Sequence, residues 1–105
     1  AVEILVDYQK IIVEICDRSP QTEIFIQSVL PINRAKSGLH VSDRELLHLN
    51  SALQKLATEY SLTYIDLYSY LSDEQHQLKE CYTLDGVHLN GQAYSIWKHV
   101  IEKYM

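Results

Sequence analysis

The chain has 105 residues, of which 47% are hydrophobic and 22% are charged, a composition that is ordinary for one globular domain. Its formal net charge is −5 and its lysines and arginines are scattered, which argues against nonspecific binding to nucleic acid. No apolar run approaches the roughly 18 residues of a membrane span. Cys16 and Cys81 are isolated in the sequence, so we expect reduced thiols and a cytoplasmic protein.

The first predicted elements are a helix at residues 2–17 and a strand at residues 22–29. Apolar side chains recur at helical spacing in the first segment, and Pro20 cannot continue the helix. The predicted apolar stripe of this helix consists of Ile4, Leu5, Tyr8, Ile11, Ile12, Ile15 and Cys16. The central run of the strand, residues 24–26, does not alternate with polar residues. It therefore predicts a parallel strand that is covered on both faces.

A loop is expected at residues 31–41, and a second helix from Ser42 to about Tyr60. Ser42 and Glu45 fit a capping box, in which the serine hydroxyl accepts from the third helical N–H and the glutamate reaches back. The predicted apolar stripe of this helix consists of Leu46, Leu49, Leu53, Leu56, Ala57 and Tyr60.

The remaining elements are a second strand at residues 62–67 and a last helix that begins at Asn90 or Gly91. Between them, residues 68–78 are ambiguous. Their first part indicates a short helical turn, and residues 72–74 indicate either a polar loop or a new helix start. The predicted buried face of the last helix consists of Ala93, Trp97, Val100, Ile101 and Tyr104.

The order of elements, helix–strand–helix–strand–helix, predicts an α/β fold with a parallel sheet. Strands that alternate with amphipathic helices are joined by right-handed crossovers, so neighbouring strands run in the same direction. The sequence contains no repeat, low-complexity tract or Pro/Gly linker, so we expect residues 1–105 to lie in one domain.

The candidate chemistry lies in residues 82–90. Asp85 and His88 are three residues apart, on either side of Gly86, which permits backbone angles that a side chain would forbid. In a serine hydrolase the imidazole takes the proton of the nucleophile, and a carboxylate fixes its tautomer. The loop follows a strand and precedes a helix, which places it at the carboxyl edge of the sheet, where α/β proteins form their sites. The alternative interpretation is a turn in which Asp85 merely accepts backbone N–H bonds.

Other polar residues carry weaker signals. Four histidines are interpreted as surface or packed side chains, with a substrate-rim role as the alternative for the two in loops: His40, His48, His76 and His99. Three serines lack a Gly-x-Ser-x-Gly or Gly-Asp-Ser context, and none is predicted as a nucleophile: Ser28, Ser37 and Ser69. No His-x-x-x-His spacing indicates a metal, and no Gly-rich phosphate loop is present, so we expect no cofactor.

Three segments together resemble a known family along nearly the whole chain. Residues 85–94 with Trp97 resemble the last conserved block of the SGNH hydrolases, which are the GDSL-type esterases and lipases. The closest likeness is to bacterial members related to platelet-activating-factor acetylhydrolase. Residues 24–31 resemble the family's strand that runs into a proline-bearing loop, and residues 64–67 resemble the strand after it.

The resemblance implies a flavodoxin-like three-layer α/β/α fold, of which residues 1–105 form the C-terminal portion of a single SGNH domain. It also implies that Asp85 and His88 are the acid and the base of a catalytic triad. The family's Gly-Asp-Ser nucleophile block, and the blocks that complete its oxyanion hole, are missing from this sequence. We therefore expect the chain alone to be inactive.

Three functions are compatible with these features. The first is an SGNH-type serine esterase that hydrolyses small, acetyl-like acyl esters, with the nucleophile and the oxyanion hole outside this chain. The second is a non-catalytic half-domain that acts as an assembly or interaction module. The third, a flavodoxin-like domain that binds a small ligand, is disfavoured because the phosphate loop is missing. Two strands leave open edges, so we expect the chain to need an N-terminal half or a homo-oligomeric partner.

Overall fold

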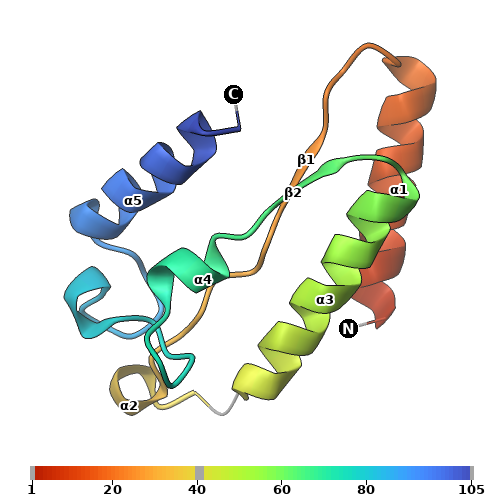
Figure 1. The fold of residues 1–105 in the computed structure, drawn as a ribbon. Coiled ribbons are helices and arrows are strands. Elements are labelled where there is room, and N and C mark those ends of the chain that lie inside the picture. The colour runs from red at the N-terminus through yellow and green to blue at the C-terminus, as the bar shows by residue number, and fades with distance from the viewer. Residues whose placement is uncertain (1, 40–41, 105) are drawn as a thin grey trace.

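The computed structural model describes residues 2–39 and 42–104. Its elements are, in order, α1 (Val2–Arg18), β1 (Phe25–Gln27), α2 (Arg34–Ser37), α3 (Asp43–Glu59), β2 (Thr63–Ile65), α4 (Tyr68–Leu71), a 3₁₀ turn η1 (Glu80–Tyr82) and α5 (Gly91–Glu102). The three long helices and the two strands follow the predicted order (Figure 1). The short helix α2 is an addition within the predicted loop 31–41, whose residues 40 and 41, with His40, lie outside the described part of the chain.

The two strands pair in parallel and separate two layers of helices. Ile26 lies opposite Tyr64 in the register, and both pack against α1 and α3. Phe25 and Ile65 pack on the other face, against Val100 of α5. Figure 1 shows α5 on one side of the strands and α1 with α3 on the other. The predicted α/β fold with a parallel sheet between helical layers is confirmed for this part of a domain.

Both strands are shorter than predicted. The pairing ends with the N–H of Ser28, which donates to the carbonyl of Ile65 at 2.9 Å, and the flanking N–H groups bond elsewhere. The N–H of Thr22 donates to the turn that follows α1, at 3.0 Å. The N–H of Val29 donates to Oδ1 of Asn50 in α3, at 2.7 Å. The predicted ranges of 22–29 and 62–67 therefore contain the strands but overestimate their length.

The hydroxyl of Ser28, a residue that follows β1, binds the backbone where the chain passes from β2 into α4. Its Oγ accepts the N–H groups of Leu67 at 3.0 Å and of Tyr68 at 2.9 Å, and the residue is buried. Leu67, at the N-cap position of α4, has no side chain that can accept these bonds, and the local Asp66 accepts only one backbone N–H, that of Ser69, at 3.1 Å. A serine that is remote in sequence thus supplies the cap, which ties the chain after β1 to the chain after β2.

The predicted apolar faces are confirmed in part. Ser42 caps α3, with its Oγ accepting the N–H of Glu45 at 3.1 Å. Ala93 and Val100 of α5 are buried as predicted. Tyr104 was wrongly predicted as buried and is 42% exposed, because α5 ends at Glu102 and the chain leaves the core there.

The apolar stripe of α1 extends past the core. Ile12 is buried, whereas Ile11 is 57% exposed and Ile4 is exposed as well. Ile11 lines a groove of about 450 Å³, which runs along β1 and reaches Trp97 of α5. The indole Nε1–H of Trp97 donates to Oε1 of Gln27 at 3.0 Å, so α5 is held to the end of β1 beside this groove.

Two further properties concern the surface. Within residues 2–39 and 42–104, no helix combines the length and the apolar composition that crossing a membrane requires. Cys16 and Cys81 are exposed free thiols.

Candidate active site

The segment from Thr83 to Asn90 forms a closed loop between η1 and α5. Thr83 pairs with Leu89 in an antiparallel bridge, and the N–H of Asn90 donates to the carbonyl of Tyr82 at 2.9 Å. Asn90 also caps α5, because its Oδ1 accepts the N–H of Ala93 at 3.0 Å. The loop is therefore fixed at both ends, and Asp85 and His88 lie at its tip.

Asp85 contacts both the ring and the main chain of the histidine. Its Oδ2 lies 2.6 Å from Nδ1 of His88. Its Oδ1 accepts the N–H groups of Val87 at 2.9 Å and of His88 at 2.8 Å. The hydrogen bond with the His88 ring, followed by these backbone bonds, holds the pKa of the Asp85 carboxyl well below its usual range. The alternative interpretation, a turn in which Asp85 merely accepts backbone N–H bonds, accounts for Oδ1 alone. Oδ2 instead contacts the imidazole of His88.

The imidazole of His88 projects into solvent. Its side chain is 86% exposed, and that of Asp85 is 54% exposed. When Nδ1–H donates to the carboxylate, Nε2 is left as an acceptor on the open side of the ring, which is the atom that takes a proton in a triad. Within the described residues, no hydrogen bond joins His88 to a serine.

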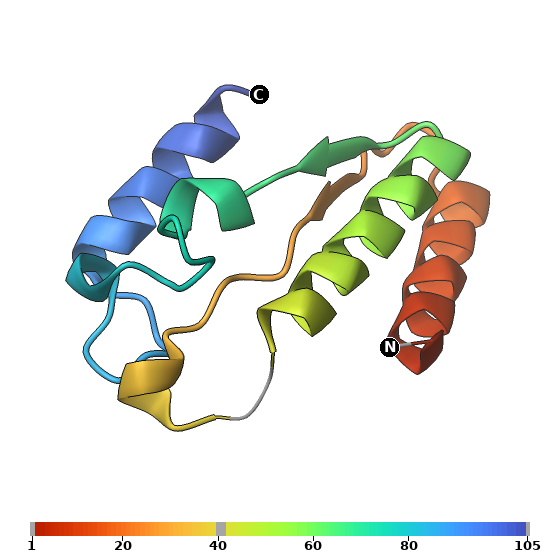
Figure 2. The same cartoon turned by 60° about the horizontal axis from the view of Figure 1, so that its bottom comes forward.

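Gly86 presses the loop against the segment that follows β1. Its φ is +88°, and a Cβ at this position would lie 2.5 Å from the carbonyl oxygen of Asn33. In turn, the N–H of Asn33 donates to the carbonyl of Gly86 at 2.8 Å. Figure 2 shows the chain before α5 beside α2, at the end of the molecule toward which β1 runs. The loop thus lies at the carboxyl edge of β1, through a contact with α2, although α4 and η1 separate it from β2 in sequence.

The remaining sequence candidates do not join the pair. His48 and His99 are exposed on α3 and α5. Oγ of Ser69 contacts Oδ2 of Asp66 at 2.6 Å, and Oγ of Ser37 accepts the N–H of Leu39 at 3.2 Å. Within residues 2–39 and 42–104, no cluster of three or more His, Cys, Asp or Glu side chains is placed to hold a metal ion.

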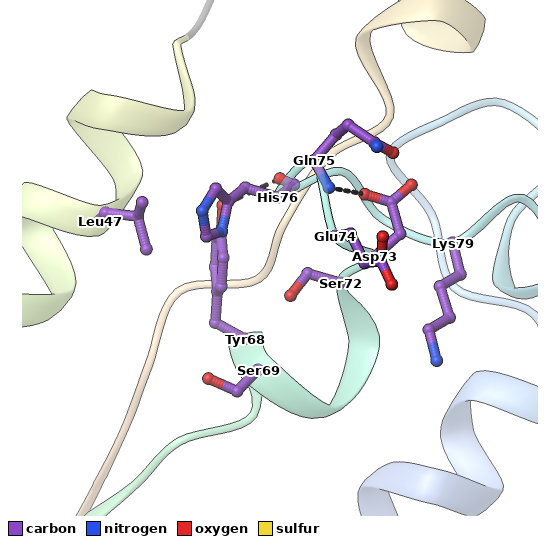
Figure 3. Close-up of a pocket in the computed structure, with 9 residues that line it drawn as sticks. All are labelled: Leu47, Tyr68, Ser69, Ser72, Asp73, Glu74, Gln75, His76 and Lys79. Atoms are coloured by element: carbon purple, nitrogen blue, oxygen red, sulfur yellow. Dashed lines mark hydrogen bonds between the residues drawn. The ribbon is translucent and has the colours of Figure 1, made fainter.

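A separate hollow of about 700 Å³ lies between α3, α4 and the turn after α4 (Figure 3). His76 stands beside the ring of Tyr68, whose Oη donates to the His76 carbonyl at 3.0 Å. Asp73 forms the turn by accepting the N–H of Gln75 at 2.9 Å. The hollow has no residue in common with the loop of Asp85 and His88.

Two residues that hold the loop carry no strong sequence signal. Thr83 is 1% exposed and Asn33 is 4% exposed, and both form hydrogen bonds to the loop. A threonine two residues before an aspartate is typical of many turns, and Asn33 is 52 positions away from Asp85. Only the closed conformation of the loop shows what these side chains do.

The fold and the loop define an α/β protein with a carboxylate–imidazole pair at the carboxyl edge of its sheet. A model of the GDSL-like lipase/acylhydrolase family matches residues 1–96. The chain belongs to this family, and the resemblance to the SGNH hydrolases is confirmed.

Solved structures agree with this assignment. A protein of Streptococcus pneumoniae that bears the name of a platelet activating factor is 31% identical, with a TM-score of 0.91 over 97% of this chain and 50% of its own. A GDSL-like lipase of Bacteroides thetaiotaomicron is 21% identical, with a TM-score of 0.71 over 89% of this chain and 48% of its own. The esterase domain of the ORF1 protein of the zebrafish ZfL2-1 retrotransposon is 23% identical, with a TM-score of 0.73 over 97% of this chain and 57% of its own.

The present chain thus spans about half the length of each of these structures. A comparison with curated proteins gives no match.

Proposed function

We propose that this chain supplies the acid–base half of a serine esterase that hydrolyses small, acetyl-like acyl esters. The observation that carries the proposal is the 2.6 Å contact between Nδ1 of His88 and Oδ2 of Asp85, with the imidazole exposed on its other side. Membership of a family of lipases and acylhydrolases supports ester hydrolysis as the reaction.

The reaction would need a serine hydroxyl and oxyanion donors from outside this chain. The hydroxyl attacks the ester carbonyl while Nε2 of His88 accepts its proton, and the resulting imidazolium then protonates the departing alcohol. Water hydrolyses the acyl-enzyme in the second half of the cycle, with His88 again as the base. Asp85 keeps the ring in the required tautomer and stabilises its positive charge.

We also propose that the chain works together with an N-terminal half or a second copy. Among the described residues, β1 pairs with β2 alone, and an apolar groove lies along β1. The same features support the second candidate function, a non-catalytic assembly module, if the completed domain has no esterase activity.

A chimera tests the proposal. In the chimera, residues 1–105 replace the half of the Streptococcus pneumoniae protein that they match, and the unmodified relative serves as the reference. On a small acyl ester that the reference hydrolyses, we expect turnover by the chimera, none by residues 1–105 alone, and none after His88→Ala. The matched control is His99→Ala, which removes an exposed histidine from α5. A folded chimera that is inactive, or equally active after His88→Ala, would overturn the proposal.

A further inference from the structure

Thr83 is a buried hydroxyl inside the candidate active-site loop, and no step of the proposed reaction uses it. Only 1% of the residue is exposed, although its neighbour Leu84 is 91% exposed. Its Oγ1–H donates to the carbonyl of His88 at 2.7 Å, with Oδ1 of Asp85 as a more distant acceptor at 3.4 Å, and its Oγ1 accepts the N–H of Gly86 at 2.9 Å. One hydroxyl thus bonds to the loop on both sides of Val87.

These bonds complete the support of the His88 main chain. Asp85 accepts the N–H of His88 at 2.8 Å, while Thr83 binds its carbonyl at 2.7 Å. Because 86% of the His88 side chain is exposed, the direction of the ring depends largely on the backbone at this residue and on the carboxylate.

We propose that Thr83 is a positioning residue, which holds the main chain of His88 so that the imidazole keeps its contact with Asp85. This inference rests on the proposed function only for its effect on turnover. Its effect on the ring is independent of catalysis, because the hydrogen bonds of Thr83 exist without substrate.

The carbonyl of Thr83 connects this support to α2. Nζ of Lys36 donates to it at 3.4 Å, and the carbonyl of Gly86 accepts the N–H of Asn33 at 2.8 Å. The loop is therefore stabilised by two sets of hydrogen bonds: those of the Thr83 hydroxyl within the loop, and those that Lys36 and Asn33 donate from α2 and its N-cap. Of these contacts, only the hydroxyl reaches His88 itself.

Three variants of the chimera test the role of the hydroxyl. Thr83→Val keeps the shape of the side chain but leaves the Gly86 N–H and the His88 carbonyl without their partner. Thr83→Ser keeps the hydroxyl. Ser28→Ala is the matched control, since it removes another buried hydroxyl that accepts two N–H groups but lies outside the loop.

The first measurement is the tautomer of His88, from imidazole ¹⁵N shifts detected through the carbon-bound ring protons. We expect the Nδ1–H form in the parent, in Thr83→Ser and in Ser28→Ala, and a mixture with the Nε2–H form in Thr83→Val. Thr83→Val with the parent tautomer would overturn the inference.

The second measurement separates kcat from KM. We expect Thr83→Val to lower kcat by about tenfold to a hundredfold, with KM nearly unchanged, because a misplaced base costs turnover rather than binding. Ser28→Ala should lower the melting temperature with kcat retained. If the two variants behave alike, Thr83 is merely structural. If the parent chimera is inactive, the proposed function fails, while the tautomer measurement still decides the role of Thr83.

Discussion

At the scale of single residues, the two oxygens of Asp85 have different tasks. Oδ1 shapes the turn by accepting two backbone N–H groups, and Oδ2 faces Nδ1 of His88. The carboxylate that closes the loop is thus also the one that contacts the ring. A substitution that keeps the turn but removes the charge separates these two tasks.

Asp85→Asn is such a substitution, because an amide oxygen can still accept the backbone N–H groups. We expect the chimera with this change to fold but to lose activity by up to about 10⁴-fold, since the carboxylate no longer selects the tautomer or stabilises the imidazolium. Ester turnover measures the effect, and Asp7→Asn on the exposed side of α1 is the control. Turnover near that of the parent would exclude Asp85 as the acid of a triad.

The pH dependence of the chimera should come from the imidazole. The His88 ring, and then the backbone N–H groups, lower the pKa of the Asp85 carboxyl, so the carboxylate stays ionised on mild acidification. Activity should therefore fall on acidification, because a protonated imidazole no longer accepts the proton of the nucleophile. A rate profile measured from neutral to mildly acidic pH tests the assignment, and a flat profile would contradict a histidine base.

The same lowered pKa has a consequence for stability. Because the folded state favours the ionised carboxyl, its stabilising contribution is present above the ordinary aspartate pKa of about 3.9. It is lost as the pH falls through the lower folded-state value. Thermal melts of the parent and of Asp85→Asn should therefore converge at strongly acidic pH.

The sequence was sufficient to identify Asp85 and His88 as candidates, and the structure places them in contact; their catalytic role remains a prediction. It was not sufficient to identify Thr83, because a buried hydroxyl is recognised only once the loop closes around it. The same holds for Asn33, whose contact with Gly86 depends on two distant segments meeting.

At the scale of secondary-structure elements, the periodicity of apolar residues predicted the three long helices and their order with the strands. Strand length was less predictable, since a ladder extends only as far as a partner is in register. Oδ1 of Asn50 accepts the N–H of Val29, and Oγ of Ser28 accepts the N–H groups of Leu67 and Tyr68 at the start of α4. Such long-range side-chain bonds leave no periodic signal.

The junction between α2 and the candidate active-site loop should be sensitive to a single methyl group. Gly86→Ala places a Cβ 2.5 Å from the carbonyl oxygen of Asn33, at a φ of +88°. The left-handed backbone alone costs about 1–3 kcal/mol for a non-glycine residue, and the overlap adds to this. We expect a marked fall in the melting temperature of the chimera.

The other two glycines are graded controls for this substitution. Gly38 has a φ of +70° but open space around it, so Gly38→Ala should cost only the backbone term. Gly91 begins α5 with nothing near its Cβ position, and Gly91→Ala should be neutral or slightly stabilising. Equal effects of all three would show that the contact between Gly86 and Asn33 is unimportant.

At the scale of the whole molecule, the described residues are less compact than a complete domain. Their radius of gyration is 14.8 Å, whereas about 13 Å is expected for a compact domain of this length. Among these residues the sheet has only two strands, and a sheet of that size is marginal without further cover. The chain also spans about half of the structures that it matches.

If another segment packs against this chain, we expect it to lie in the groove along β1. An unpaired strand edge offers N–H and C=O groups to another strand, and here apolar side chains of α1 and Trp97 flank it. Ile11 is 57% exposed on this side of α1, which costs free energy unless another segment packs on it. A second half or a second copy of the chain would bury these groups.

We therefore predict that residues 1–105 do not form a well-folded isolated monomer. Size-exclusion chromatography with light scattering and a thermal melt should show either an associated species or no cooperative transition.

A pair of variants in the chimera then tests which part of α1 another segment covers. Ile11→Asp changes an exposed residue that lines the groove, and Val13→Asp changes one on α1 that does not. The first should lower the melting temperature much more than the second, because we expect a complete domain to cover the groove. A cooperative melt from a strictly monomeric 12.2 kDa chain, with both variants equivalent, would show that two strands and three long helices are already self-sufficient.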